Sequence, residues 1–320
     1  MSASLAVRAA RPRSHGLLET AKMARLSIRS WKREWRRIAA LLCLVVATGG
    51  AAPVIHAAEQ PLTMGIFPRN KAAETTTRYT PLANYLSERL GRKVILVTAK
   101  DFDAFWKAVT ERRYDIVHYN QYHYIRSAQS YKVIAHNQEF GKNAVAGALY
   151  VRKDSGITEL SQLRGRTIIF GGGKDAMLSY IAPRFLLMQA GLKEGEFKTE
   201  FAVNPPNTLL ALFNRQADAA GGGDILIDLP VVKSAVNTEE LRLLAATEPL
   251  LFLPWAVNRS MPTKLADSIQ SVIVDLARSE AGKEVLKAAQ TTGIERAGDR
   301  AYDPHRKMIN AVFGPEGTAK

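Results

Sequence analysis

Short apolar runs of strand length alternate with amphipathic helical windows over most of residues 59–320. This alternation is typical of β-α-β units and a mainly parallel sheet. Thr80 stands before Pro81, which is a favoured pairing for a helix cap and the first helical residue, so the first helix is expected to begin there. The first series predicts strands and helices, in chain order, at 62–67, 80–90, 93–98, after Asp101 or Asp103, and at 114–119.

A second series of the same kind follows residues 149–151. Its expected elements are a short helix, a strand, a helix, a strand, a helix and a strand, at 157–163, 167–170, 175–190, 198–203, 207–215 and 217–220. Extended segments at 243–246 and 250–257 lead back to a helical block at 263–278 and 280–290. Two α/β halves joined by two extended crossings predict two lobes with a cleft between them.

The amino-terminal segment, residues 1–58, predicts a secretory signal peptide. It holds ten Lys or Arg against two Asp or Glu and runs into an uncharged apolar stretch at 38–52. Small residues at Ala57 and Ala58 suit cleavage near either one, and translation starting at Met23 would give a signal of ordinary length. The alternative, a membrane anchor, needs roughly 20 apolar residues, and Pro53 follows this stretch early. We therefore expect a periplasmic protein.

Removal of the signal changes what the composition implies. The eight net positive charges of residues 1–58 leave with it, so the formal charge falls from +14 to +6. The remaining chain shows no basic run interleaved with aromatic residues, and we expect no nucleic-acid partner. Because the single cysteine, Cys43, lies in the signal, the mature chain offers no disulfide, thiol nucleophile or cysteine metal site. The expected lobes comprise residues 59–148, 149–246 and, back in the first lobe, 247–320.

An ordered set of short motifs resembles the phosphate-, phosphite- and phosphonate-type substrate-binding proteins of ABC transporters. The motifs are Gly-Ile-Phe-Pro at 65–68, Pro-Leu-Ala-Asn-Tyr-Leu at 81–86, Arg-Tyr-Asp-Ile at 113–116, Val-Arg-Lys-Asp-Ser-Gly-Ile at 151–157, Leu-Ser-Gln-Leu-Arg-Gly at 160–165, Tyr-Ile-Ala-Pro-Arg at 180–184 and Ala-Asp-Ala-Ala at 217–220. The resemblance implies a type II periplasmic-binding-protein fold, in which two α/β lobes with an interlobe ligand cleft close on a small-molecule ligand at a hinge. It also implies an ABC permease and ATPase as partners.

The sequence departs from the family pattern where the ligand would bind. Phosphonate binders carry a Ser-Thr-Ser-Gly run before the Tyr-x-x-Pro segment, and Ala-Met-Leu-Ser stands here at 176–179. The cleft histidine of the family aligns with Pro205 or Pro206. The resemblance therefore implies fold and transport, with a small phosphonate- or phosphate-like anion as the expected ligand and its identity left open.

The loop at 170–175 joins a predicted strand to a helix and is rich in glycine. Glycines let backbone amides turn toward an anion, and a lysine adds a full charge. The candidate ligand contacts here are Gly172, Gly173, Lys174, Asp175 and Ala176. The alternative is a tight turn with Lys174 in solvent.

Tyr119, Asn120 and Gln121 follow a predicted strand of the first lobe, where open α/β sheets present groups to ligands. An aromatic face with amide donors suits a small organic ligand. His118 and His123 raise the alternative of a metal site, but strand alternation separates them and no acidic partner is expected near them. We therefore expect packed or surface histidines and no metal.

Three further candidates end predicted strands: Phe67, Asn204 and Asp224. Asp224 either binds an amine or hydroxyl of the ligand or caps the next turn. Of the two asparagines around the Pro205-Pro206 pair, Asn207 is the expected helix cap.

Three functional classes remain open on sequence. A binding protein is favoured, and we expect it to be a monomer without a cofactor. An enzyme on the same fold is disfavoured because the chain shows no cysteine nucleophile, no nucleophile elbow and no paired metal ligands, so no catalytic residue is assigned. A sensory accessory protein would need the same closing motion as a transport protein.

Overall fold

The computed structural model describes residues 59–317, and the predicted export signal lies outside the described residues. The strands are β1 Leu62–Ile66, β2 Val94–Thr98, β3 Ile116–His118, β4 Tyr131–Gln138, β5 Ala144–Val145, β6 Gly147–Arg152, β7 Thr167–Gly171, β8 Lys198–Ala202, β9 Ala219–Gly223, β10 Leu241–Ala246, β11 Leu250–Leu251, β12 Pro254–Asn258 and β13 Gly293–Arg296. The helices are α2 Ala72–Leu90, α3 Phe102–Thr110, α4 Gln121–Ser127, the π-helix η3 Met177–Ile181, α5 Ala182–Gln189, α6 Pro205–Phe213, α7 Pro230–Lys233, α8 Thr263–Val274, α9 Glu280–Ala289 and α10 Asp303–Phe313.

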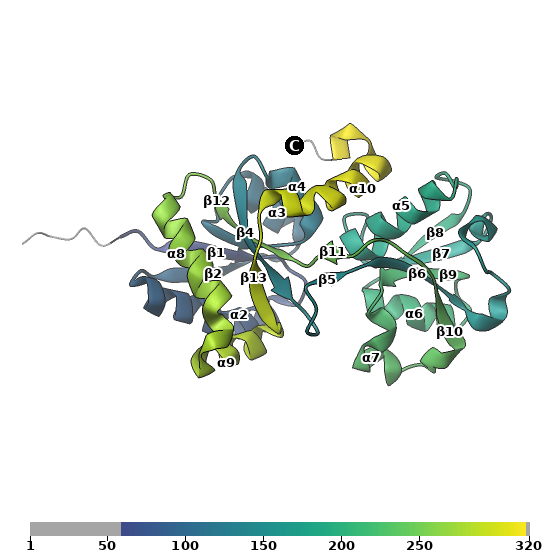
Figure 1. The fold of residues 1–320 in the computed structure, drawn as a ribbon, viewed down its shortest axis with the longest axis horizontal. Coiled ribbons are helices and arrows are strands. Elements are labelled where there is room, and N and C mark those ends of the chain that lie inside the picture. The colour runs from purple at the N-terminus through teal and green to yellow at the C-terminus, as the bar shows by residue number, and fades with distance from the viewer. Residues whose placement is uncertain (1–58, 318–320) are drawn as a thin grey trace, which may run out of the picture. The chain divides into compact units, whose positions relative to one another are not determined.

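The first lobe is built on a six-stranded sheet of order β13-β4-β12-β3-β1-β2. Strand β1 is parallel to β2 and β3, while β12 runs antiparallel between β3 and β4. Because β12 and β13 come from late in the sequence, the chain completes this lobe only after it has built the other one (Figure 1).

The second lobe carries a five-stranded sheet of order β10-β6-β9-β7-β8, in which β7 is parallel to both of its neighbours. The chain passes from the first sheet to the second through β5 and returns through β11, and these two strands pair with each other. The observed architecture is therefore two α/β lobes joined by two extended crossings, as the alternation of apolar runs predicts.

Three apolar clusters form the core of the protein. One lies under α2, α8 and α9 on one face of the first sheet, and another lies under α6 and α7 on one face of the second. The third runs without interruption from α3 and α4 through η3 and α5 to α10. Helix α10 therefore packs against both lobes, and Figure 1 shows it lying across α4 and α5.

The start of the first helix was predicted wrongly. Helix α2 begins at Ala72, and Pro81 lies inside it. The turns before Pro81 persist because Thr75 and Tyr79 are buried, and because the hydroxyl of Thr80 donates to the carbonyl of Thr76 at 2.7 Å. Proline removes one amide donor there, a loss that the packing of Tyr79 outweighs.

Two other local expectations differ from the structure. Asn204, not Asn207, caps α6, and its side-chain oxygen accepts from the amide of Asn207 at 3.2 Å. Both prolines then fall in the first turn of the helix, where a missing amide costs little. Strand β13 and helix α10 were not predicted. Within residues 59–317, none of the helices combines the length and hydropathy of a membrane span.

Candidate functional site between the lobes

The loop after β7 is shaped by close backbone approaches. A side chain at Gly171 would place its Cβ 2.5 Å from the Cα of Pro205, so glycine is required there. Gly172 adopts a φ of +83°, a left-handed conformation that favours glycine. The loop folds back on itself, with the amide of Gly172 donating to Ala202 and that of Ala176 donating to Gly173.

The loop keeps three successive amides available for a ligand. The N–H groups of Gly173, Lys174 and Asp175 have no acceptor among the described residues, and Gly173 and Lys174 are exposed. Successive free amides in a turn form a concavity that favours an anion. The amides of Gly172 and Ala176, in contrast, are used within the protein.

Helix α4 of the first lobe faces this loop. Asn120 caps the helix through its side-chain oxygen, which accepts from the amide of His123 at 2.8 Å. Its side-chain nitrogen donates to the backbone carbonyl of Asp175 at 3.3 Å, and so reaches the second lobe. Gln121 donates from its side chain to Leu251 of β11 at 2.9 Å. The start of α4 thus contacts both the glycine loop and the hinge, which is formed by the paired strands β5 and β11.

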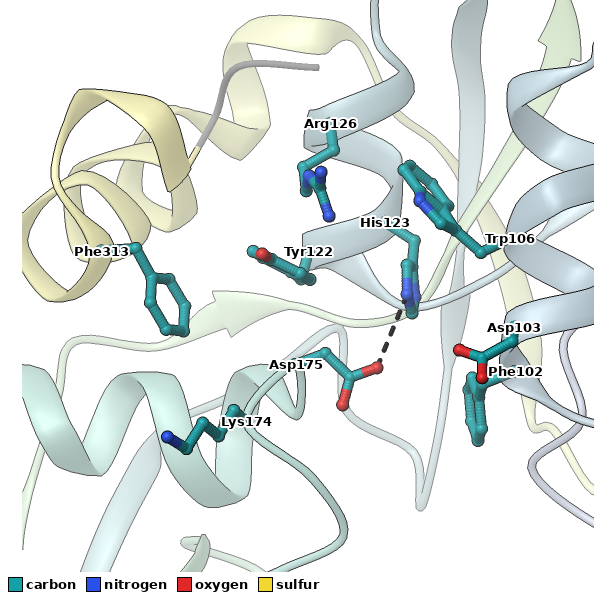
Figure 2. A pocket seen from close by; sticks show the side chains of 9 residues that line it. All are labelled: Phe102, Asp103, Trp106, Tyr122, His123, Arg126, Lys174, Asp175 and Phe313. Atoms are coloured by element: carbon teal, nitrogen blue, oxygen red, sulfur yellow. Dashed lines mark ion pairs between the residues drawn. The ribbon is translucent and has the colours of Figure 1, made fainter.

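A pocket of about 290 Å³ lies where these elements meet. Figure 2 shows that its walls come from α3, α4, the loop after β7 and the end of α10. The lining side chains are Phe102, Asp103, Trp106, Tyr122, His123, Arg126, Lys174, Asp175 and Phe313. Aromatic walls with a few charged groups match the usual character of a small-molecule site.

His123 and Asp175 meet across this pocket, so the expectation that no acidic residue lies near the histidines was wrong. The Nε2 atom of His123 lies 3.5 Å from the carboxylate Oδ2 of Asp175 (Figure 2). Burial lowers the pKa of His123 to about 4, although the charge of Asp175 acts in the opposite direction. His123 is therefore neutral at neutral pH, and its other ring nitrogen, Nδ1, is buried without a partner among the described residues.

The two cations of the pocket are held differently. The guanidinium of Arg126 lies 5.1 Å from the ring centroid of Trp106 and 5.6 Å from that of Tyr122, in cation–π geometry. Lys174 extends from the exposed loop on the opposite wall (Figure 2). The pocket therefore offers two positive groups, together with the carboxylates of Asp103 and Asp175.

Of the residues predicted from the sequence, Lys174 and Asp175 line this pocket. Gly172, Gly173 and Ala176 belong to the same loop but not to the pocket lining, and Asn120 is one hydrogen bond away. Tyr119 lies elsewhere: it is fully buried, and its hydroxyl lies 2.9 Å from that of Ser127.

Four other candidates also have partners within the protein. Phe67 is buried with its ring against those of Phe102 and His118, and Gln121 bonds to the hinge. The side chain of Asn204 caps α6. The carboxylate of Asp224 accepts from the amide of Ala146 at 3.2 Å, a contact with the segment between β5 and β6 that neither alternative from the sequence predicts.

Sequence reasoning missed most of the pocket walls. Phe102, Trp106 and Tyr122 come from helix faces rather than strand ends, and Phe313 comes from a helix that was not predicted. The available signal was Phe102 and Trp106 at helical spacing, a pattern that also describes buried core. Within residues 59–317, no group of three or more His, Cys, Asp or Glu is placed to hold a metal ion.

Two α/β lobes around a mixed aromatic and charged pocket define the class of two-lobed binding proteins. A family model described as the phosphonate periplasmic substrate-binding protein of ABC transporters matches residues 64–302. The chain belongs to this family. The family comprises solute-binding proteins that work outside the cytoplasm, so the expected solute-binding role is confirmed.

Individual relatives agree with this assignment. The phosphonates-binding periplasmic protein of Escherichia coli K12 is 23% identical over 271 residues, which cover 79% of this chain and 78% of that protein. PhnD1 of Prochlorococcus marinus, solved with methylphosphonate, is 17% identical with a TM-score of 0.66, covering 79% of this chain and 98% of that chain. A Xanthomonas citri protein solved with ATP is 18% identical with a TM-score of 0.68, covering 79% and 96%. The type II periplasmic-binding-protein fold is thereby confirmed.

Proposed function

We propose that this chain captures a small phosphonate- or phosphate-like anion between its lobes and delivers it, as a monomer, to an ABC permease and its ATPase. The observation that carries the proposal is the pocket itself, because its walls come from both lobes. A ligand held there contacts both lobes at once, and its binding energy favours the closed arrangement.

The charges and donors around the pocket suit an oxyanion. Lys174 supplies an exposed ammonium, and the three free amides of the glycine loop supply directed donors without a side-chain charge. Arg126, placed over the rings of Trp106 and Tyr122, adds a guanidinium whose planar donors match oxyanions. These groups take the place of the hydroxyl run that the sequence lacks at 176–179.

Closure also has defined protein contacts. Asn120 and His123, both at the start of α4, reach Asp175 in the other lobe. The hinge is the paired β5 and β11, short strands whose ends absorb a change of angle between the lobes. A closed lobe pair presents one continuous surface, which a permease distinguishes from the open form.

The export signal is part of the same proposal. Residues 1–58 would direct secretion, with cleavage near Ala57 or Ala58. The intact mass of the protein recovered from the periplasm measures the new amino terminus. A mass that retains the apolar stretch at 38–52 would contradict cleavage.

A thermal-shift titration tests the ligand. The exported protein is melted with increasing methylphosphonate, phosphate or phosphite, and with choline as a cationic control. Ligand at 100 times its Kd should add about 2.7 kcal/mol of stability. A shift with choline alone, or with none of the anions, would contradict the anion proposal.

A further inference from the structure

Asp175 places a negative group at the site proposed for an anion. Its side chain is 35% exposed and lines the pocket, next to Lys174 in sequence. The carboxylate approaches His123, and the backbone carbonyl of the same residue accepts from Asn120. Among the pocket-lining residues, Asp175 is the acidic residue that contacts the opposite lobe.

His123 is the residue of the opposite lobe that this carboxylate approaches. The neutral ring has one N–H. The carboxylate of Asp175 favours that N–H on Nε2, because Nε2 is the ring nitrogen that it approaches. The tautomer leaves Nδ1 as a lone-pair acceptor, and this atom is buried with no partner among the described residues. Because Nδ1 is buried, a ligand in the pocket reaches the carboxylate of Asp175 rather than this atom.

A fully ionised oxyanion has acceptors only, and so cannot donate to the carboxylate of Asp175. Two acidic groups share one site when a proton lies between them, because the like charges otherwise repel. A singly protonated phosphonate carries such a proton on one oxygen and keeps a negative charge for Lys174 and the loop amides. A sulfonate has the same tetrahedral shape and no proton.

We infer that Asp175 is a specificity-determining residue, which selects singly protonated oxyanions and rejects sulfonates. The inference rests on the proposed function, since it concerns the ligand of the same pocket. Asp103 from α3, Arg126 from α4 and Lys174 from the loop also face this point. Their charges change the affinity for a singly protonated phosphonate and for a sulfonate alike, because the two anions carry the same net charge.

Calorimetric titration tests the inference. The exported protein is titrated with methylphosphonate and with methanesulfonate at a pH where methylphosphonate is singly protonated. The wild type should bind methylphosphonate at least about tenfold more tightly, the effect of one hydrogen bond to a charged group. In Asp175→Asn the amide can donate to either anion, and the ratio of the two Kd values should fall to within about threefold. Asp267→Asn removes a carboxylate on α8, outside the pocket, and should leave the ratio unchanged.

The possible results separate the two proposals. Equal wild-type affinity for both anions, or an unchanged ratio in Asp175→Asn, would overturn the selection and leave the anion site standing. Binding of neither anion would overturn both. Taurine, a sulfonate with an ammonium group, is the third probe: tight binding would assign the proton donor to an amine and overturn the inference. A pH series on the wild type needs no variant, and affinity for methylphosphonate should fall as its second proton dissociates.

Discussion

Phe313, at the end of α10, lies against Tyr122 of α4 with their ring centroids 5.7 Å apart. The same ring stacks near Tyr180 of the second lobe at 6.4 Å. One aromatic side chain from the carboxyl-terminal helix therefore contacts both lobes at the pocket, and α10 is anchored to the hinge through His305, whose Nε2 lies 3.2 Å from the carbonyl of Leu251.

Replacing Phe313 by alanine should weaken ligand binding without unfolding the protein. Aromatic pairs contribute about 0.5–1.5 kcal/mol beyond buried area, which corresponds to an increase in Kd of about two- to twelvefold. Calorimetric titration with methylphosphonate measures this change in Kd. Phe140→Ala removes an equal ring that is 57% exposed and outside the pocket. An equal effect of both variants would argue against a role for α10 at the site.

Lys174→Ala should raise the Kd for methylphosphonate about three- to tenfold, since an exposed charge contributes modestly to binding. The affinity should also become less sensitive to salt. The matched control is Lys198→Ala, because Lys198 pairs with Thr167 at the opposite end of β7 from the glycine loop. Titrations at low and high salt compare the two. If the control lost as much affinity, Lys174 would be solvated surface, the alternative left open from the sequence.

Buried histidines predict a loss of stability in mild acid. Burial lowers the pKa of His118 to about 3, and those of His123 and His305 to about 4, from an ordinary value of 6.5. The unfolded chain therefore binds more protons than the folded chain between about pH 4 and 6.5. Stability should fall as the pH drops through this window, by up to about 1.4 kcal/mol per unit for each histidine.

Urea unfolding at about pH 7 and about pH 5 measures this slope. The variant His123→Gln keeps a polar side chain and removes one titrating group, so its stability should depend less steeply on pH. A wild-type stability that stays constant, or rises, on acidification would contradict the burial of neutral histidines.

Trp255 should be among the most costly side chains to truncate in the first lobe. Its indole N–H donates to the side-chain oxygen of Asn137 at 2.8 Å, and its ring stacks on His118 with centroids 4.2 Å apart. Trp255→Phe leaves the buried oxygen of Asn137 without that donor and should cost about 1–3 kcal/mol. Urea unfolding gives the free energy; a loss below about 0.5 kcal/mol would mean that water replaces the bond.

The fold could be predicted largely from the sequence because apolar periodicity reports which faces are buried. The prediction of individual elements failed where tertiary packing overrides a local signal. Pro81 reads as a helix start, yet Thr75 and Tyr79 extend α2 before it because both are buried. Helix α10 was missed because its apolar face, with Met308 and Ile309, is buried only against elements that are far away in sequence.

The candidate site could be predicted only in part, for a related reason. The rule that ligands lie at strand ends led to Lys174 and Asp175, and to Asn120 beside them. The same rule chose Tyr119 and Gln121, whose side chains turn into the core and toward the hinge. Trp106, Tyr122 and Phe313 became neighbours only when three helices packed together, which no local pattern reveals.

A crystal structure of the exported protein grown with methylphosphonate shows whether the ligand binds between the lobes. We expect the ligand there, with its oxygens on Lys174 and the loop amides and its acid proton directed at Asp175. A ligand bound elsewhere on the chain, or two lobes that enclose no ligand while methylphosphonate is in excess, would contradict this expectation.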